Sequence, residues 1–344
     1  MPVLVIVVAF GLMIFIHELG HFIAAKSFGV LVHEFSMGMG PKLFSFKKGE
    51  TQYSLRLFPI GGYVKLEGEV EANDENDPRS FINLPPIKRI IILFAGAFMN
   101  LILGFVIFAV INMNSGIITS VIKDVPMEYK EQNSIFMPGD EILKLNNTRV
   151  HTFEDVSLFM SRYIDEELSV KIRRNEKIQN FENVKLFKTN AGYKLGVSFA
   201  YEDASILKST EFALYNTVYT AKAVYFALGD LISGKAPMSS LSGPVEIVAV
   251  VDRETKDLPR NEYTFLWILS LVAMITVNLG IFNLLPFPAL DGGSIIIALF
   301  ELITRKKVKS EVIGYITTIG FVLLMLLAVY VTADDIYSLV KQAG

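Results

Sequence analysis

Cysteine is absent from the 344-residue chain, which excludes a disulfide-stapled scaffold and any zinc site built from thiolates. Histidine is scarce, with only four residues. Basic clusters are short: the net charge is -3, and the longest basic run is residues 305–307. The sequence therefore lacks the basic footprint of a nucleic-acid-binding protein, and we expect no nucleic-acid partner.

Charge is also missing from four long stretches, since residues 1–16, 90–122, 263–290 and 312–333 contain no Asp, Glu, Lys or Arg. Hydrophobic residues make up 52% of the chain and charged residues 19%. Long apolar runs of this kind exclude a soluble globular enzyme and a disordered chain. The lipid bilayer is the expected environment.

Three of these stretches contain the roughly 20 apolar residues that a helix needs to cross a bilayer: 90–111, 265–285 and 312–331. A fourth span starts at residue 2 and has to continue to residue 25 to reach that length. A cleaved signal peptide is the alternative for this segment. The missing positive charge before Lys26 argues against it.

Lysine and arginine in the short loops predict the orientation of the spans. Such residues gather between the first two spans and again between the last two, so both loops should be cytoplasmic. Both termini and residues 112–262 are then expected on the extracytoplasmic side.

Between the spans, residues 35–66 alternate as a hairpin near the membrane, and residues 67–77 form an acidic loop. Residues 117–201 contain strand patterns at 117–122, 141–146, 168–173 and 184–187 and a helix pattern at 153–164. Residues 205–233 have apolar residues at helical spacing and are expected along the membrane surface. The fold class is an α-helical polytopic membrane protein with four transmembrane helices, a membrane-associated β-hairpin and an inserted α+β domain.

The expected segments are as follows: transmembrane helix 1 at 1–31; a cytoplasmic β region and loop at 32–89; transmembrane helix 2 at 90–112; an extracytoplasmic domain at 113–202; an amphipathic helix and connector at 203–262; transmembrane helix 3 at 263–293; a cytoplasmic loop at 294–311; transmembrane helix 4 at 312–333; and a C-terminal tail at 334–344.

The sharpest motif is His17-Glu18-Leu19-Gly20-His21 in the first span. Residues i and i+4 share one face of a helix, so His17 and His21 can bind one cation while Glu18 reaches the metal's water as a base. Two buried core histidines beside a Glu are the structural alternative. Ionisable residues within a span are costly, which favours a functional site.

Two histidines leave a tetrahedral zinc site in need of a third protein ligand and a water. Asp291 is the acidic residue near the last two spans with apolar residues on its N-terminal side, and it follows Pro286 and Pro288, which interrupt regular helix. A simple helix-ending turn at the interface is the alternative. Because the motif at residues 17–21 lacks a third metal ligand, Asp291 is the candidate for that ligand.

These segments resemble the site-2 protease family of intramembrane zinc metalloproteases, of the bacterial regulator-of-sigma-E protease type with an inserted PDZ domain. The resemblance lies in the His-Glu-Leu-Gly-His motif, in residues 58–65 (FPIGGYVK), in residues 278–288 (NLGIFNLLPFP) and in residues 290–293 (LDGG). It covers most of the chain.

The resemblance implies His17, His21 and Asp291 as Zn²⁺ ligands and Glu18 as the catalytic acid and base. It implies Asn283, Pro286 and Pro288 as substrate-binding residues, and a hairpin that receives an unwound substrate by strand addition. It also implies that residues 117–201 form a single PDZ-like domain. We treat His33 and His151 as non-ligands.

Two positions depart from the family pattern. Ala97 stands where a proline is frequent, and Glu246 stands where a small residue is frequent. Neither position is an expected metal ligand.

The function expected from these residues is regulated intramembrane proteolysis of single-span membrane proteins, either anti-sigma factors or remnant signal peptides, after a first extracytoplasmic cut. A non-catalytic adaptor with a structural zinc is a second class, but such a site would need no Glu18 and would be closed. A transporter with a broken span is a third class, disfavoured by the absence of repeat symmetry.

Overall fold

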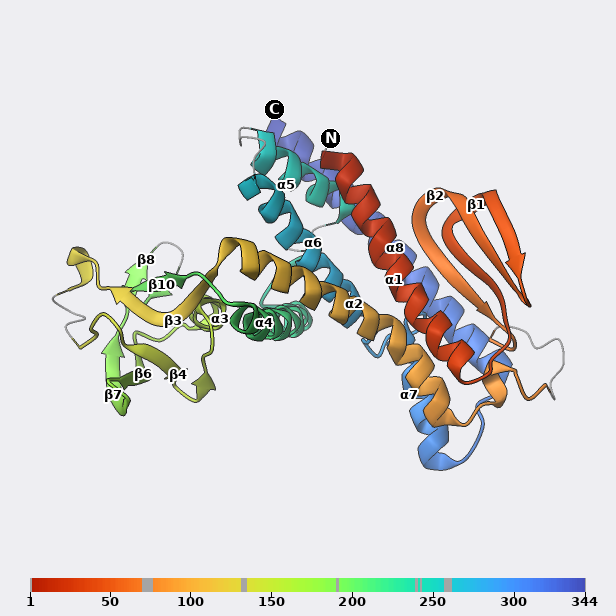
Figure 1. The fold of residues 1–344 in the computed structure, drawn as a ribbon, viewed down its shortest axis with the longest axis horizontal. Helices are drawn as coiled ribbons and strands as arrows, with labels where there is room; N and C mark the ends of the chain where they lie inside the picture. The colour runs from red at the N-terminus through yellow and green to blue at the C-terminus, as the bar shows by residue number, and fades with distance from the viewer. Residues whose placement is uncertain are drawn as a thin grey trace. The chain divides into compact units, whose positions relative to one another are not determined.

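The computed structural model describes residues 2–69, 77–130, 135–189, 192–238, 241, 243–256 and 262–343. The chain divides into two compact units (Figure 1). One unit comprises residues 1–104 and 224–344, and the other comprises residues 105–223. Most of the acidic loop expected at residues 67–77 lies outside the described residues.

Within the described residues, four helices are long and apolar enough to cross a membrane. They fall on the four charge-free stretches, which confirms the expected spans. Exposed large apolar side chains recur on α2 every three or four residues, the spacing of one helix face, and such a face is suited to lipid contact. The four helices are α1 (Pro2–Ser27), α2 (Pro86–Ser115), α6 (Glu262–Asn283) and α8 (Ser310–Ala343).

Strands β1 (Val32–Lys48) and β2 (Thr51–Leu66) form the expected hairpin, but each strand bends and supplies two segments of the sheet. Residues 34–37 lie between residues 62–65 on one side and residues 52–55 on the other. The bend in β1 contains Gly38 at φ +84°, where a Cβ atom would lie 2.5 Å from the carbonyl oxygen of Phe58. Glycine therefore permits this fold of the strand.

Two shorter helices flank the last spans, α5 (Pro244–Lys256) and α7 (Asp291–Thr304). Helix α7 corrects the loop expected at residues 294–311. It is apolar, it begins with the acidic Asp291 and it ends at Arg305 in a left-handed conformation. With 14 residues it is too short to span a bilayer. A sequence search for membrane-spanning segments therefore does not identify it.

Helix α5 is anchored to α8 through its first turn. The Asp335 carboxylate accepts hydrogen bonds from the backbone N–H groups of Gly243 and Glu246, at 3.1 and 3.0 Å. At Glu246, one of the two departures from the family pattern, the backbone N–H is thus bound by Asp335. Ala97, the other departure, is fully buried within the uninterrupted α2.

The second unit is a mixed α+β domain around a sheet of order β10-β3-β4-β6-β7, with β5 paired to β4 (Figure 1). Its core includes Ile122, Ile142, Leu145, Val170 and Ile172. The predicted strands at 117–122, 141–146 and 168–173 and the predicted helix at 153–164 are present. The strand predicted at 184–187 is instead the end of a longer strand, β7, followed by β8.

The elements of this unit are β3 (Ile117–Asp124), β4 (Glu141–Leu145), β5 (Thr148–Arg149), α3 (Phe153–Arg162), β6 (Glu167–Arg174), β7 (Lys177–Lys185), β8 (Phe187–Thr189), β9 (Gly192–Lys194), β10 (Ser198–Glu202) and the first part of α4 (Ile206–Ile232).

Candidate active site

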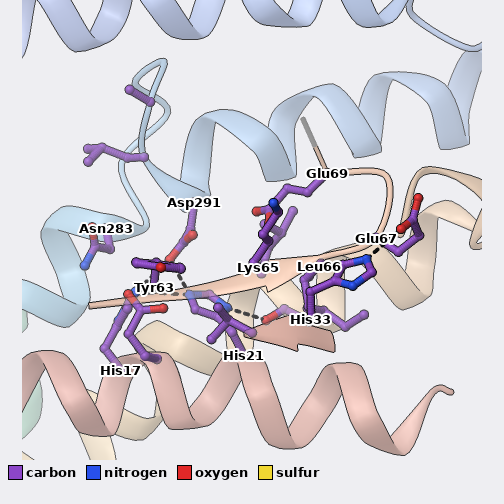
Figure 2. A pocket seen from close by; sticks show the side chains of 16 residues that line it. His17, His21, His33, Tyr63, Lys65, Leu66, Glu67, Glu69, Asn283 and Asp291 are labelled. Atoms are coloured by element: carbon purple, nitrogen blue, oxygen red, sulfur yellow. Dashed lines mark hydrogen bonds and ion pairs between the residues drawn. The ribbon is translucent and has the colours of Figure 1, made fainter. Parts of the chain in front are cut away.

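Helix α1 places His17 and His21 one turn apart on the same face, as their spacing predicts. Their Nε2 atoms are 3.1 Å apart, and their rings meet edge to face with centroids 4.7 Å apart. Figure 2 shows both side chains pointing from α1 towards the same space. The two imidazoles can therefore reach a single ion.

Asp291 approaches this pair from the break between α6 and α7. Its Oδ2 atom lies 3.2 Å from Nε2 of His17 and 3.4 Å from Nε2 of His21 (Figure 2). The chain turns tightly here: a Cβ atom on Gly292 would lie 2.1 Å from the carbonyl oxygen of Leu285. The helix interruption expected from Pro286 and Pro288 thus places the carboxylate of Asp291 beside the two histidines.

Two groups on α2 lie beside the Nδ1 atoms of the imidazoles, on the side opposite the candidate metal-binding Nε2 atoms. The Nδ1–H group of His21 donates to the carbonyl oxygen of Ile92 at 2.9 Å, which leaves a lone pair on Nε2. The amide nitrogen of Asn100, a fully buried residue, lies 3.5 Å from Nδ1 of His17, and the amide oxygen has no hydrogen-bond partner. With the amide group turned by 180°, the oxygen would accept from His17 Nδ1–H and leave the lone pair on His17 Nε2.

At Gly96, α2 lies so close to the histidines that there is no room for a side chain. A Cβ atom on Gly96 would lie 2.3 Å from Nε2 of His21 and 2.9 Å from Cε1 of His17. Gly20 on α1 is equally close to α2, because a Cβ atom there would lie 2.3 Å from the carbonyl oxygen of Ala95. Glycines at these two positions let the helices approach closely around the site.

The donor set suits zinc. Within the described part of the chain, His17, His21 and Asp291 are the one group of three metal-ligating side chains whose donor atoms converge, all within 4.8 Å of one another. The buried Oδ2 atom of Asp291 lacks a hydrogen-bond donor. Two imidazole nitrogens and one carboxylate oxygen, with a fourth position for water, are a ligand set of catalytic zinc.

A cavity of about 730 Å³ opens beside these ligands, and it brings Glu18 and Asn283 together with them. Glu18 packs close to β2, since a Cβ atom on Gly62 would lie 3.1 Å from its Cγ atom. Pro286 and Pro288 do not line this cavity. Pro288 instead packs against α8, where a Cβ atom on Gly320 would lie 2.4 Å from it.

Several cavity residues were not anticipated from the sequence. The run Tyr63–Leu66 of β2 lines one side, and Glu67, Glu69 and His33 extend the polar wall (Figure 2). The side chain of His33 bonds the carboxylate of Glu67 at 2.6 Å. The stretch FPIGGYVK at residues 58–65 was the available sequence signal for the β2 residues.

A polar network fixes Tyr63 at the cavity wall. The Arg56 guanidinium donates to the hydroxyl of Tyr63 at 2.5 Å and to the carboxylate of Glu34 at 3.0 Å. Partial burial acts to raise the pKa of Glu34, but hydrogen bonds from Ser54, Arg56 and their neighbours outweigh it and lower the pKa to about 2. Glu34 is thus a fixed anion at the centre of the sheet.

Comparison with known proteins agrees with this geometry. The profile of peptidase family M50 matches residues 5–327. Relatives from Clostridium acetobutylicum (39% identical, 97% of each chain) and Clostridium perfringens (36% identical, 98% of each chain) are provisionally named zinc metalloproteases. Zinc metalloprotease RasP from Geobacillus kaustophilus is 28% identical, with 96% of each chain covered.

Proposed function

The chain belongs to peptidase family M50, and from this premise we propose that it cleaves single-span membrane proteins within or near their transmembrane segment. It is a zinc metalloprotease and an integral membrane protein. The proposed substrates are anti-sigma factor-like proteins or remnant signal peptides that have already received an extracytoplasmic cut.

One observation supports this proposal above the others. His17, His21 and Asp291, three side chains that could hold one metal ion, line the same cavity as Glu18, and they lie on or beside helices that are apolar enough to span a membrane. A site with only a structural metal has no need of an adjacent base or of an open cavity. The arrangement therefore favours hydrolysis over a purely binding role.

His17, His21 and Asp291 are the proposed zinc ligands, and bound zinc would act as a Lewis acid that lowers the pKa of water from 15.7 to about 7. Glu18 is the proposed general base, which removes a proton from the attacking water. The same carboxyl group then delivers that proton to the departing amine nitrogen. The carbonyl oxygen of Ile92 holds the imidazole of His21 in place throughout.

The substrate segment has to be extended before its peptide bond can be attacked, because a helical peptide bond is shielded by its own hydrogen bonds. Residues 62–66 of β2 are suited to receive it. Among the described residues they pair with β1 on one side only, and Tyr63–Leu66 line the cavity. We propose strand addition at this edge, with Asn283 holding the strand and Pro286 and Pro288 shaping the turn behind it.

The second unit is the proposed PDZ-like domain, supported by its antiparallel sheet of six strands and by α3 packed against β3. It would capture an extended segment or exclude bulky ectodomains. The Lys and Arg residues between α1 and α2 and between α7 and α8 support an orientation with both termini outside the inner membrane and the active site towards the cytoplasm.

The deciding experiment compares the detergent-purified wild type with Glu18→Gln, measuring zinc content and cleavage of a single-span substrate with and without a zinc chelator. We expect equal zinc content in both proteins. Cleavage should fall by about 10²–10⁴-fold in the variant, the usual contribution of a general base, and the chelator should abolish wild-type cleavage.

The matched control is Glu182→Gln, an exposed position on β7 far along the chain from the site residues, which should cleave as the wild type does. Cleavage at the wild-type rate by Glu18→Gln would show that the assigned base is wrong. Wild-type protein without zinc would contradict the ligand set.

A further inference from the structure

A second cavity, of about 620 Å³, lies entirely within residues 105–223. It is bounded by the sheet of that unit and by the first turns of α4, with Phe212 and Tyr215 among its walls. Its charged lining is mainly basic, with five Lys or Arg residues and three Glu residues. The catalytic steps of the proteolytic proposal do not use this cavity.

Three of the basic residues form a row across neighbouring strands. Lys144 on β4 lies directly opposite Arg149 on β5 and also opposite Lys171 on β6. Lys171 alternates along β6 with the core residues Val170 and Ile172, so it belongs to the face turned away from the core. Like charges directly opposite one another destabilise a sheet.

None of the three glutamates of the cavity forms an ion pair with this row. Glu141 pairs with Arg173 at 2.6 Å, Glu202 pairs with Lys208, and Glu211 accepts from the hydroxyl of Tyr215 at 3.0 Å and keeps its negative charge. In the described part of the chain, Lys144, Arg149 and Lys171 make no ion pair. With five basic and three acidic residues, the cavity has a net positive charge, and its basic row has no paired counter-ion.

The same unit also contains residues 105–115, the C-terminal end of the candidate span α2. Helix α2 has 30 residues, about 45 Å of helix against a hydrocarbon core of about 30 Å, so its ends reach the headgroup layer. Near its C-terminal end, Asn112 donates to the carbonyl oxygen of Ser209 at 3.3 Å. Ser209 follows Lys208, which lines the cavity.

The start of α4 has a surface suited to the bilayer interface. Ile206 is 70% exposed and Leu207 is 81% exposed, immediately before Lys208. Exposed apolar side chains next to basic ones are typical of segments that lie at a membrane surface. A water-filled peptide groove would not require either feature.

We propose that this cavity binds the headgroup of an anionic phospholipid, with Lys144, Arg149 and Lys171 contacting its phosphate. The bound lipid would supply the counter-charge that the row lacks and would hold the α+β unit against the membrane. The proposal is independent of the proteolytic chemistry, because none of its residues belongs to the catalytic cavity.

The test is native mass spectrometry of the full-length protein in detergent, titrated with phosphatidylglycerol or with phosphatidylcholine of the same acyl chains. We expect the wild type to retain phosphatidylglycerol about ten- to a hundredfold more tightly, since each basic residue near an anionic headgroup adds to affinity. The variant K144Q/R149Q/K171Q should lose most of that preference. It should stay folded, because the substitutions remove repulsion within the row.

A charge-matched control, K177Q/K185Q/K188Q, changes three exposed lysines of the same unit outside the cavity and should keep the preference. Equal retention of the two lipids by the wild type, or an unchanged preference in K144Q/R149Q/K171Q, would overturn the proposal. A soluble Glu-rich peptide is titrated as a third ligand. If the peptide binds the wild type but not that variant while the lipids do not differ, the cavity is a peptide site instead.

Discussion

The Nδ1 atom of His21 lies 2.9 Å from the carbonyl oxygen of Ile92, 71 residues further along the chain. This hydrogen bond joins a metal-ligand candidate on α1 to the backbone of α2. It fixes both the orientation and the tautomer of the imidazole, as the partners behind metal-binding histidines commonly do. The packing of α2 against α1 should therefore control zinc affinity.

Gly96→Ala tests that packing directly. The new Cβ atom would lie 2.3 Å from Nε2 of His21, so the ring has to move away from the ligand position. We expect at least about a tenfold loss of zinc affinity, with a parallel loss of cleavage, measured by metal titration. Gly314→Ala on α8 is the control, because no atom lies within 4 Å of its Cβ position. Wild-type zinc affinity in Gly96→Ala would contradict the close approach of α2 to the His21 ring at Gly96.

Asn100 offers a test of the tautomer of His17. We expect Asn100→Leu to lower zinc affinity by about 10–100-fold, the usual effect of removing such a partner. Asn100→Asp should retain more affinity, because a carboxylate can only accept the Nδ1–H bond. Zinc titration of both variants provides the comparison. The acceptor role is wrong if the aspartate variant binds zinc no better than the leucine variant.

A buried ion pair joins the start of α2 to α7. The side chains of Arg89 and Glu301 are 6% and 4% exposed, and Glu301 also accepts from the backbone N–H of Val308 at 2.7 Å. Removing one partner of such a pair costs about 3–5 kcal/mol. Arg89→Met should therefore lower the unfolding temperature in detergent markedly. The double variant R89M/E301L should recover part of that loss, and an additive loss would argue against direct pairing.

The acid stability of the β1–β2 sheet should depend on Glu34. Its pKa in the folded protein is about 2, below its ordinary value of 4.5. The charged form therefore stabilises the fold above pH 4.5, and this contribution is lost as the pH falls from 4.5 towards 2. Protease resistance of the sheet should differ between the wild type and Glu34→Gln at pH 7 and converge near pH 2. A constant difference across that range would exclude this role.

Local patterns in the sequence predicted a large part of the fold. Charge-free stretches identified the spans, and the i, i+4 spacing of His17 and His21 placed two ligands on one face. Asp291 could be proposed only because apolar residues and prolines precede it and because the family resemblance supports it. Its actual distance from the histidines depends on how α6 and α7 pack.

Other features depend on tertiary contacts that no local pattern reveals. Helix α7 is too short to register as a span, and the pairing of Arg89 with Glu301 joins residues 212 positions apart. The sheet of β1 and β2 exceeds a simple hairpin because Gly38 lets the strand fold over. The orientation of His17 by Asn100 likewise exists only once α1 and α2 are packed.

The position of Asp291 in the chain also has a consequence for biosynthesis. His17 and His21 emerge from the ribosome long before Asp291, and α7 follows three of the four candidate spans. Until the last quarter of the polypeptide has been made, the proposed ligand set is incomplete. A newly synthesised molecule would thus be inert while neighbouring nascent proteins enter the membrane, without any separate inhibitor.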